Sequence, residues 1–124
     1  MESIEVPIIC AMHAGVFGLG VEVALACDLR IAETQAKLAL PEARVGLLPC
    51  AGGTQRLAQL VGEGWAKKMI LCNERIDAET AERIGLVEEV VETGTALERA
   101  LALAGQAAQQ SPSAVARCKR LIHS

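Results

Sequence analysis

The stretch that decides the fold covers residues 6–32 and reads VPIICAMHAGVFGLGVEVALACDLRIA. It begins with an apolar, partly β-branched run that ends at Met12 and is typical of a buried strand. A glycine-punctuated turn follows over residues 13–20, and residues 20–27 have the length and composition of a helix. Residues 28–32 are typical of a second short strand. This order of strand, helix and strand predicts an α/β protein.

The remainder of the chain is predicted to become mainly helical. Another strand is expected at residues 36–40, and a loop rich in Gly and Pro at residues 41–53. Thr54 is predicted to cap a helix that stops at Gly62, and Asp77 to cap one that stops at Gly85. We therefore expect one partial domain, with a strand, helix and loop segment over residues 1–53 and a mainly helical segment over residues 54–124.

Further elements are predicted near the C-terminal end of the sequence. Residues 86–91 should form a short strand, and Ser111 followed by Pro112 predicts the start of a last helix. Between them, a helix over residues 96–110 should bury a single stripe of its surface, made of Leu97, Ala100, Leu101, Ala104 and Ala108.

Composition excludes several classes of function. The chain has 124 residues, which suits one domain, and 52% of them are hydrophobic. An aromatic share of 2% and a net charge of −3 argue against a nucleic-acid partner. The longest uncharged apolar stretch, residues 6–21, contains Pro7 and His13 and is too short to span a bilayer.

The cysteines indicate the compartment. They are five in number, widely spaced and without a C-x-x-C pair, so they predict small core residues of a reduced, cytoplasmic protein rather than disulfides. With only two histidines in the chain, we expect no metal site. The cysteines are Cys10, Cys27, Cys50, Cys72 and Cys118.

Glu22 is the first candidate for chemistry. Its neighbours over residues 20–27 are all apolar, so a carboxylate there is costly unless it is paired, neutral or facing a cavity. A salt bridge to a distant Arg or Lys and a catalytic role explain this pattern equally well. A dinucleotide-binding loop does not explain the pattern, because Val23 stands where the third glycine of G-x-G-x-x-G would be.

Glu42 is the second candidate, in a loop directly after a predicted strand. Alone it would be an ordinary surface acid. Its interest comes from the combination with the Gly-rich turn before Glu22 and with residues 52–54, Gly-Gly-Thr, which open another helix. Peptide N–H groups at a helix start suit a developing oxyanion, and two carboxylates beside it can divide acid and base work.

Taken together, these segments resemble the enoyl-CoA hydratase/isomerase (crotonase) family over nearly the whole chain. The resemblance implies an α/β, crotonase-like fold of ββα superhelix turns followed by helices, truncated here at both ends. It rests on six ordered segments: residues 6–12, 13–22, 26–32, 40–49, 52–57 and 81–87.

The resemblance implies hydration of 2-enoyl-CoA thioesters to 3-hydroxyacyl-CoA. Glu22 and Glu42 match the family's two acids, which hold one water, take its proton as it attacks the β-carbon and deliver a proton to the α-carbon. The backbone N–H of Leu19 matches an oxyanion donor, and Gly18 and Cys50 fall in the substrate-binding segments. Leu19 and Cys50 each stand where the family usually has Gly, which would narrow the pocket or shift substrate preference.

The resemblance also implies the partners. No separate cofactor is expected, because coenzyme A is part of the acyl-CoA thioester substrate. A homo-oligomer is expected, as a trimer or a dimer of trimers. Lys119 and Arg120 on the last helix could face solvent or a neighbouring subunit's nucleotide.

Two alternatives remain open from the sequence. One is another activity of the family, such as enoyl-CoA isomerisation. The other is a non-catalytic truncated remnant or assembly subunit, because the family's first oxyanion donor and much of its coenzyme A pocket come from segments without a counterpart here. Since such segments would cover apolar surface, the isolated chain is expected to be oligomeric in light scattering.

Overall fold

The N-terminal part of the fold is a repeated strand–strand–helix unit. The structure is a computed structural model that describes residues 4–17, 19–40 and 53–123. Each repeat gives one strand to each of two sheets, because β1 pairs in parallel with β3 and β2 pairs in parallel with β4. The elements of this part are β1 (Ile9–Met12), β2 (Gly15–Phe17), α1 (Leu19–Ala26), β3 (Leu29–Glu33) and β4 (Lys37–Ala39).

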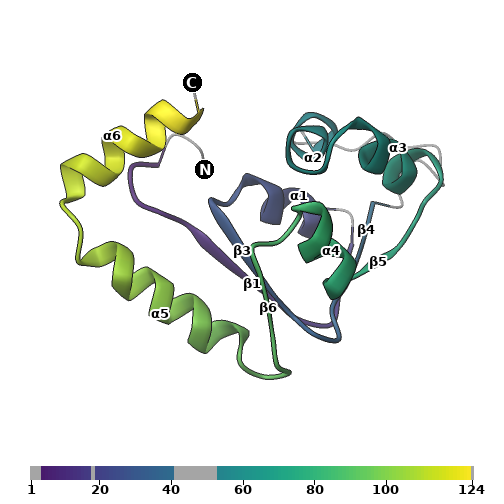
Figure 1. Cartoon of the computed structure of the whole chain (residues 1–124), viewed down its shortest axis with the longest axis horizontal. Helices are drawn as coiled ribbons and strands as arrows, with labels where there is room; N and C mark the ends of the chain where they lie inside the picture. Colours follow the sequence, from purple (N-terminus) through teal and green to yellow (C-terminus); the bar gives the residue numbers. More distant parts are fainter. Residues whose placement is uncertain (1–3, 18, 41–52, 124) are drawn as a thin grey trace.

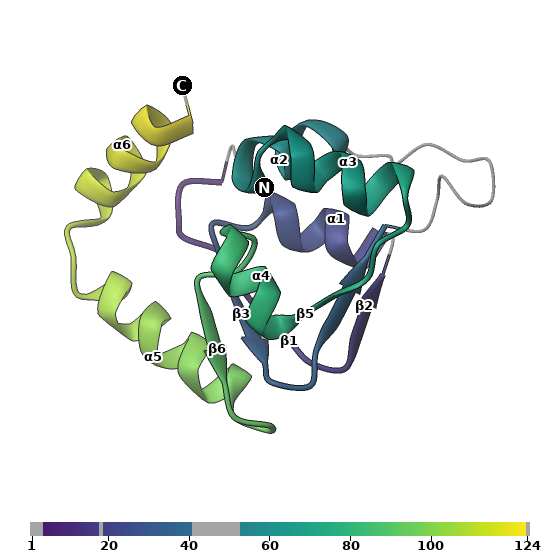
Figure 2. The same cartoon turned by 45° about the vertical axis from the view of Figure 1, so that its right-hand side comes forward.

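The later elements complete the two sheets and cover them. Among the described residues, the sheet orders are β1-β3-β6 and β2-β4-β5, and β5 runs antiparallel to β4. Helices α5 and α6 lie on the opposite side of the molecule from α2 and α3 (Figure 1 and Figure 2). These elements are α2 (Gly53–Val61), α3 (Glu63–Leu71), β5 (Ile76–Asp77), α4 (Ala78–Ile84), β6 (Glu89–Val91), α5 (Ala96–Ala108) and α6 (Pro112–His123).

The core is aliphatic, as the low aromatic content requires. Its main cluster includes Val21 and Leu25 of α1, Leu38 of β4, Leu57 of α2 and Met69 of α3. A smaller cluster forms where α5 packs on β1 and β3. Helix α1 is therefore held between the second sheet and α2, and this contact fixes the element that carries the first candidate acid.

Local signals predicted several boundaries well. Helix α1 begins one residue before the predicted start and ends one residue before the predicted end. Asp77 caps α4 by accepting a hydrogen bond of 2.8 Å from the Thr80 N–H, and Gly85 ends that helix. Helix α6 begins at Pro112, with the Ser111 hydroxyl 3.4 Å from the Ala114 nitrogen, so the predicted start is confirmed.

Other predictions of local structure were wrong. The predicted turn over residues 13–20 contains the strand Gly15–Phe17, because these residues pair with Lys37–Ala39. The predicted strand at residues 86–91 is shorter, since only Glu89–Val91 pair with β3. Helix α2 starts at Gly53, so Thr54 lies inside it rather than at its cap.

The predicted buried stripe of α5 is also wrong in part. Ala96 and Ala100 are buried, whereas Leu97 and Leu101 are 65% and 63% exposed. The helix turns Ala96, Ala100 and Leu103 toward Ile31 and Ile9 of the first sheet. Small residues face the sheet because the helix lies close to it, and the two large side chains are left on the adjacent face.

The expectation that all cysteines are core residues fails for two of them. Cys27 is buried and Cys10 is half-buried, but Cys72 and Cys118 are exposed. Cys50 lies outside the described residues. Cys72 follows the end of α3, and Cys118 lies on α6, a helix with few buried side chains.

Gly85 provides a test of the α4 terminus. Its φ of 89° is left-handed, and a Cβ built there would lie 3.1 Å from the Leu60 carbonyl oxygen. We expect Gly85→Ala to lower the free energy of unfolding by about 1–2 kcal/mol, because an L side chain is strained in this conformation. Urea titration measures the change.

The matched control is Gly105→Ala. Gly105 lies inside α5, and a Cβ there meets nothing within 4 Å. This substitution should raise the free energy of unfolding by about 0.5–1 kcal/mol, because Ala loses less backbone entropy than Gly in a helix. If both substitutions changed the free energy of unfolding in the same direction, the assignment of strain to Gly85 would be contradicted.

Candidate active site

The candidate site begins where β2 and β4 end. Phe17 and Ala39 are register partners at the ends of these strands. Because the strands are parallel, the chain leaves both of them at the same edge of the sheet. One exit leads at once into α1, which holds Leu19 and Glu22, and the other leads toward Glu42. The backbone thus brings the start of α1, which carries Glu22, and the end of β4, which precedes Glu42 in the sequence, to one sheet edge.

Helix α1 presents its N-terminus at this edge. Leu19 is its first residue, so the Leu19 N–H belongs to the group of amides without an acceptor inside the helix. Leu19 therefore has helical backbone dihedrals, which any L residue adopts. The family's usual glycine is not needed for the backbone conformation found here. The aligned peptide dipoles also place a partial positive charge at this end of α1.

The described residues contain part of the predicted site. Leu19 and Glu22 both belong to α1. Gly18, Glu42 and Cys50 lie outside the described residues. The segment with Glu42 and Cys50 starts after Leu40, which follows β4, and ends at α2, and both β2 and α2 contact α1. Of the described residues on either side of that segment, Leu40 and Leu57 belong to the same core cluster as Val21 and Leu25 of α1.

Arg30 was not predicted as a site residue. It binds the C-terminal end of α1, opposite the end that carries Leu19. It lies in β3 and is 4% exposed. Its Nη1 donates hydrogen bonds to the carbonyl oxygens of Ala24 at 3.0 Å, Cys27 at 2.8 Å and Leu25 at 3.5 Å. Ala24 and Leu25 lie in the last turn of α1, which has no basic residue of its own, and Cys27 directly follows the helix. The sequence signal was an arginine between the apolar residues Leu29 and Ile31.

The other side of the Arg30 guanidinium binds the segment between α4 and β6. Nε donates to the Leu86 carbonyl at 2.9 Å, and Nη2 lies 3.3 Å from Glu88 Oε1. The same carboxylate oxygen accepts the Arg30 backbone N–H at 2.7 Å, and the Glu88 N–H donates to the Arg30 carbonyl at 2.9 Å. One side chain therefore joins α1 to the β3–β6 ladder.

A second buried ion pair fastens the last helix to the N-terminal segment. Lys119 of α6 is buried, and its Nζ lies 2.8 Å from Asp28 Oδ2 and donates to the Val6 carbonyl at 3.0 Å. Arg120 is exposed and lies 3.5 Å from Glu5. Lys119 is thus used inside the chain rather than turned toward solvent.

The two described cysteines near α1 have raised pKa values. Burial, with a smaller contribution from the neighbouring Cys27 thiol, raises the pKa of Cys10 to about 11. Burial also raises the pKa of Cys27, although the charge of Arg30 opposes this effect. Because the thiolate is the reactive form, these shifts disfavour a nucleophilic role for either thiol.

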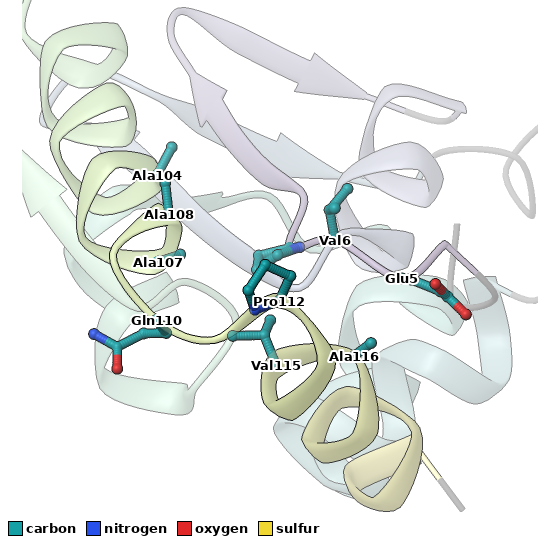
Figure 3. Close-up of a pocket in the computed structure, with 10 residues that line it drawn as sticks. Glu5, Val6, Ala104, Ala107, Ala108, Gln110, Pro112, Val115 and Ala116 are labelled. Atoms are coloured by element: carbon teal, nitrogen blue, oxygen red, sulfur yellow. The ribbon is translucent and has the colours of Figure 1, made fainter.

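A cavity of about 300 Å³ lies between the α5–α6 turn and the segment before β1 (Figure 3). Its lining is apolar apart from Glu5 and Gln110, and no candidate site residue belongs to it. The lining residues are Glu5, Val6, Pro7, Ala104, Ala107, Ala108, Gln110, Pro112, Val115 and Ala116.

Two features are absent from the described part of the chain. No cluster of three His, Cys, Asp or Glu side chains there is arranged to hold a metal ion. No helix there combines the length and hydropathy needed to cross a membrane.

Comparison with known proteins decides the family. The sequence model of the enoyl-CoA hydratase/isomerase family matches residues 1–124. The chain belongs to this family. The short-chain-enoyl-CoA hydratase of Clostridium acetobutylicum is 41% identical over 123 residues, which cover 99% of this chain and 47% of that protein.

Solved structures of similar proteins share the fold. Pseudomonas aeruginosa DspI is 62% identical, with a TM-score of 0.96 over 98% of this chain and 50% of that one. An enoyl-CoA hydratase from Bacillus anthracis is 41% identical, with a TM-score of 0.95 over 99% of this chain and 48% of that one. The predicted crotonase-like α/β fold is confirmed, and the chain spans about half the length of these relatives.

Proposed function

We propose that this chain belongs to an enzyme that adds water to 2-enoyl-CoA thioesters and forms 3-hydroxyacyl-CoA. The observation that supports the proposal is the parallel register of β2 and β4, which ends at one sheet edge the strand before α1, with Glu22, and the strand that precedes Glu42 in the sequence. Two relatives that share the fold are named enoyl-CoA hydratases. Coenzyme A enters as part of the substrate, so the proposal requires no separate cofactor.

In the proposed reaction, Glu22 and Glu42 hold one water between them. One carboxylate takes a proton from this water as its oxygen bonds to the β-carbon, and the π electrons move onto the thioester oxygen. The other acid, in its protonated form, delivers a proton to the α-carbon as the electrons return from the thioester oxygen, which completes the addition. Two acids are needed, because one acts as the base and the other as the proton donor.

The N-terminus of α1 is proposed to stabilise the thioester oxygen. The Leu19 N–H is free of an intrahelical acceptor and stands at the positive end of the helix dipole. A donor of this kind is most effective where negative charge develops in the transition state. Gly18 and Cys50 are proposed to line the acyl path beside it, and the enzyme is proposed to work as a homo-oligomer.

Crotonyl-CoA tests the proposed function. We expect loss of the conjugated enoyl thioester absorbance and formation of a 3-hydroxyacyl-CoA, identified by a mass increase of one water. The saturated butyryl-CoA is the control and should remain unchanged. A product of unchanged mass with a moved double bond would support isomerisation instead. Calorimetry with CoA and crotonyl-CoA that finds neither binding nor turnover would support the non-catalytic remnant or assembly subunit.

A further inference from the structure

Local groups satisfy only part of the C-terminal end of helix α1. The Cys27 N–H donates to the Ala24 carbonyl at 3.1 Å, and the Cys27 thiol donates to the Val23 carbonyl at 3.4 Å. Cations stabilise this end of the helix dipole, but the last turn of α1 contains no basic residue. The buried Arg30 supplies a cation from β3, and its Nη1 donates to the carbonyls of Ala24, Leu25 and Cys27.

The end held by Arg30 is close to the proposed chemistry. Helix α1 has eight residues, so its two ends are only about 12 Å apart. The helix is short, and Val21, Ala24 and Leu25 are packed in the core, so it moves as one body. A tilt at Ala24 would therefore displace the Leu19 N–H and Glu22 together.

Arg30 is also bound on the side away from α1. Four contacts join Arg30 to Leu86 and Glu88, and they use both the side chain and the backbone of Arg30. The guanidinium can make these contacts and those to α1 at once because it is planar and has donors on several sides. Arg30 thus fixes the position of α1 relative to the paired strands β3 and β6.

We infer that Arg30 is a positioning residue for the proposed hydration. By holding the C-terminal carbonyls of α1, it sets the positions of the Leu19 N–H and of Glu22. This inference rests on the proposed function. A displacement of about 1 Å in an active site can cost 10²-fold in rate. The loss of this anchor should therefore appear in kcat more than in the binding of coenzyme A.

The test compares Arg30→Lys with Arg99→Lys. Lysine keeps the positive charge but offers a single ammonium that cannot span α1, Leu86 and Glu88. Arg99 of α5 is a matched control, because it binds Glu89 of β6 through two hydrogen bonds of 2.7 and 3.0 Å and so joins a different helix to the same sheet. Both variants are assayed in the same form of the protein as the wild type.

Three measurements are made on each variant. We expect Arg30→Lys to lower kcat for crotonyl-CoA by roughly 10- to 100-fold with KM changed by less than about threefold. The enolate absorbance of bound acetoacetyl-CoA should fall, because that band reports the oxyanion donors. Amide hydrogen exchange in α1 should become faster. Arg99→Lys should leave all three at the wild-type value.

Two results would overturn the inference. One is wild-type kcat and enolate absorbance in Arg30→Lys, even if its melting temperature falls. The other is an equal loss in Arg99→Lys. Absence of turnover and of the enolate band in the wild type would instead contradict the proposed function. In that case exchange in α1 still decides whether Arg30 holds the helix.

Discussion

Glu22→Gln and Glu42→Gln should each lower kcat for crotonyl-CoA hydration by roughly 10²- to 10⁴-fold. Glutamine keeps the size and much of the hydrogen bonding of glutamate, but it neither takes a proton from water nor delivers one at neutral pH. The change is measured as the initial rate of absorbance loss under saturating substrate. KM should change far less, because the amide still contacts the bound water and thioester.

The double variant makes this test sharper. If the two acids act on one water as a unit, Glu22→Gln with Glu42→Gln should cost about as much as the worse single variant rather than the product of both. Glu98→Gln is the control, because Glu98 is exposed in the first turn of α5. Rates within about twofold of the wild type for both single variants would show that the acid/base assignment is wrong.

Lys119→Met should lower the free energy of unfolding by about 3 kcal/mol. Both partners of the Lys119–Asp28 pair are largely buried, with side chains 8% and 17% exposed. Removal of the ammonium leaves the Asp28 carboxylate with the Ile8 N–H at 2.7 Å and His123 at 3.4 Å, and without its strongest partner. An uncompensated buried charge is costly, so α6 should also separate from the N-terminal segment more readily.

The matched control for Lys119→Met is Lys67→Met. Lys67 lies 2.7 Å from Glu63, a distance close to that of the buried pair, but its side chain is 62% exposed. The loss of this surface pair should change the free energy of unfolding by less than about 0.5 kcal/mol. A double-mutant cycle with Asp28→Asn isolates the pair itself. Equal effects of the two lysine substitutions would mean that burial does not strengthen the Lys119 pair.

The same ion pair predicts how stability depends on pH. Burial by itself raises the pKa of Asp28, but hydrogen bonds from Lys119, the Ile8 N–H and His123 outweigh it and hold the pKa below its usual 3.8. The contribution of Asp28 to stability is therefore full above about pH 4 and is lost as the pH falls further. The stability difference between wild type and Lys119→Met should shrink over that acid range, as measured by urea unfolding.

Several features could be predicted because their causes are local. The cap at Asp77, the stop at Gly85 and the start at Pro112 depend on a few neighbouring residues. The strands Gly15–Phe17 and Ile76–Asp77 were missed because they are very short. Their strand state depends on pairing with β4 rather than on their own pattern.

The candidate site, too, could be predicted from the sequence only in part. Glu22 and Glu42 were selected from the sequence because a carboxylate in an apolar helix is costly and because the motifs around both acids are ordered as in the family. The strands that precede the two acids in the sequence, β2 and β4, end at one sheet edge because of their register, which no local pattern contains. Arg30 was missed because its partners at Leu86 and Glu88 come from a distant part of the chain.

The sequence by itself therefore determined the family, the aliphatic core and most helix ends, since apolar periodicity and capping act over a few residues. The tertiary structure decided which face of α5 is buried, which carboxylate neutralises Lys119 and what holds the end of α1. These outcomes depend on which segments meet in space. The energy of a buried charge or a packed face comes from partners that are remote in the chain.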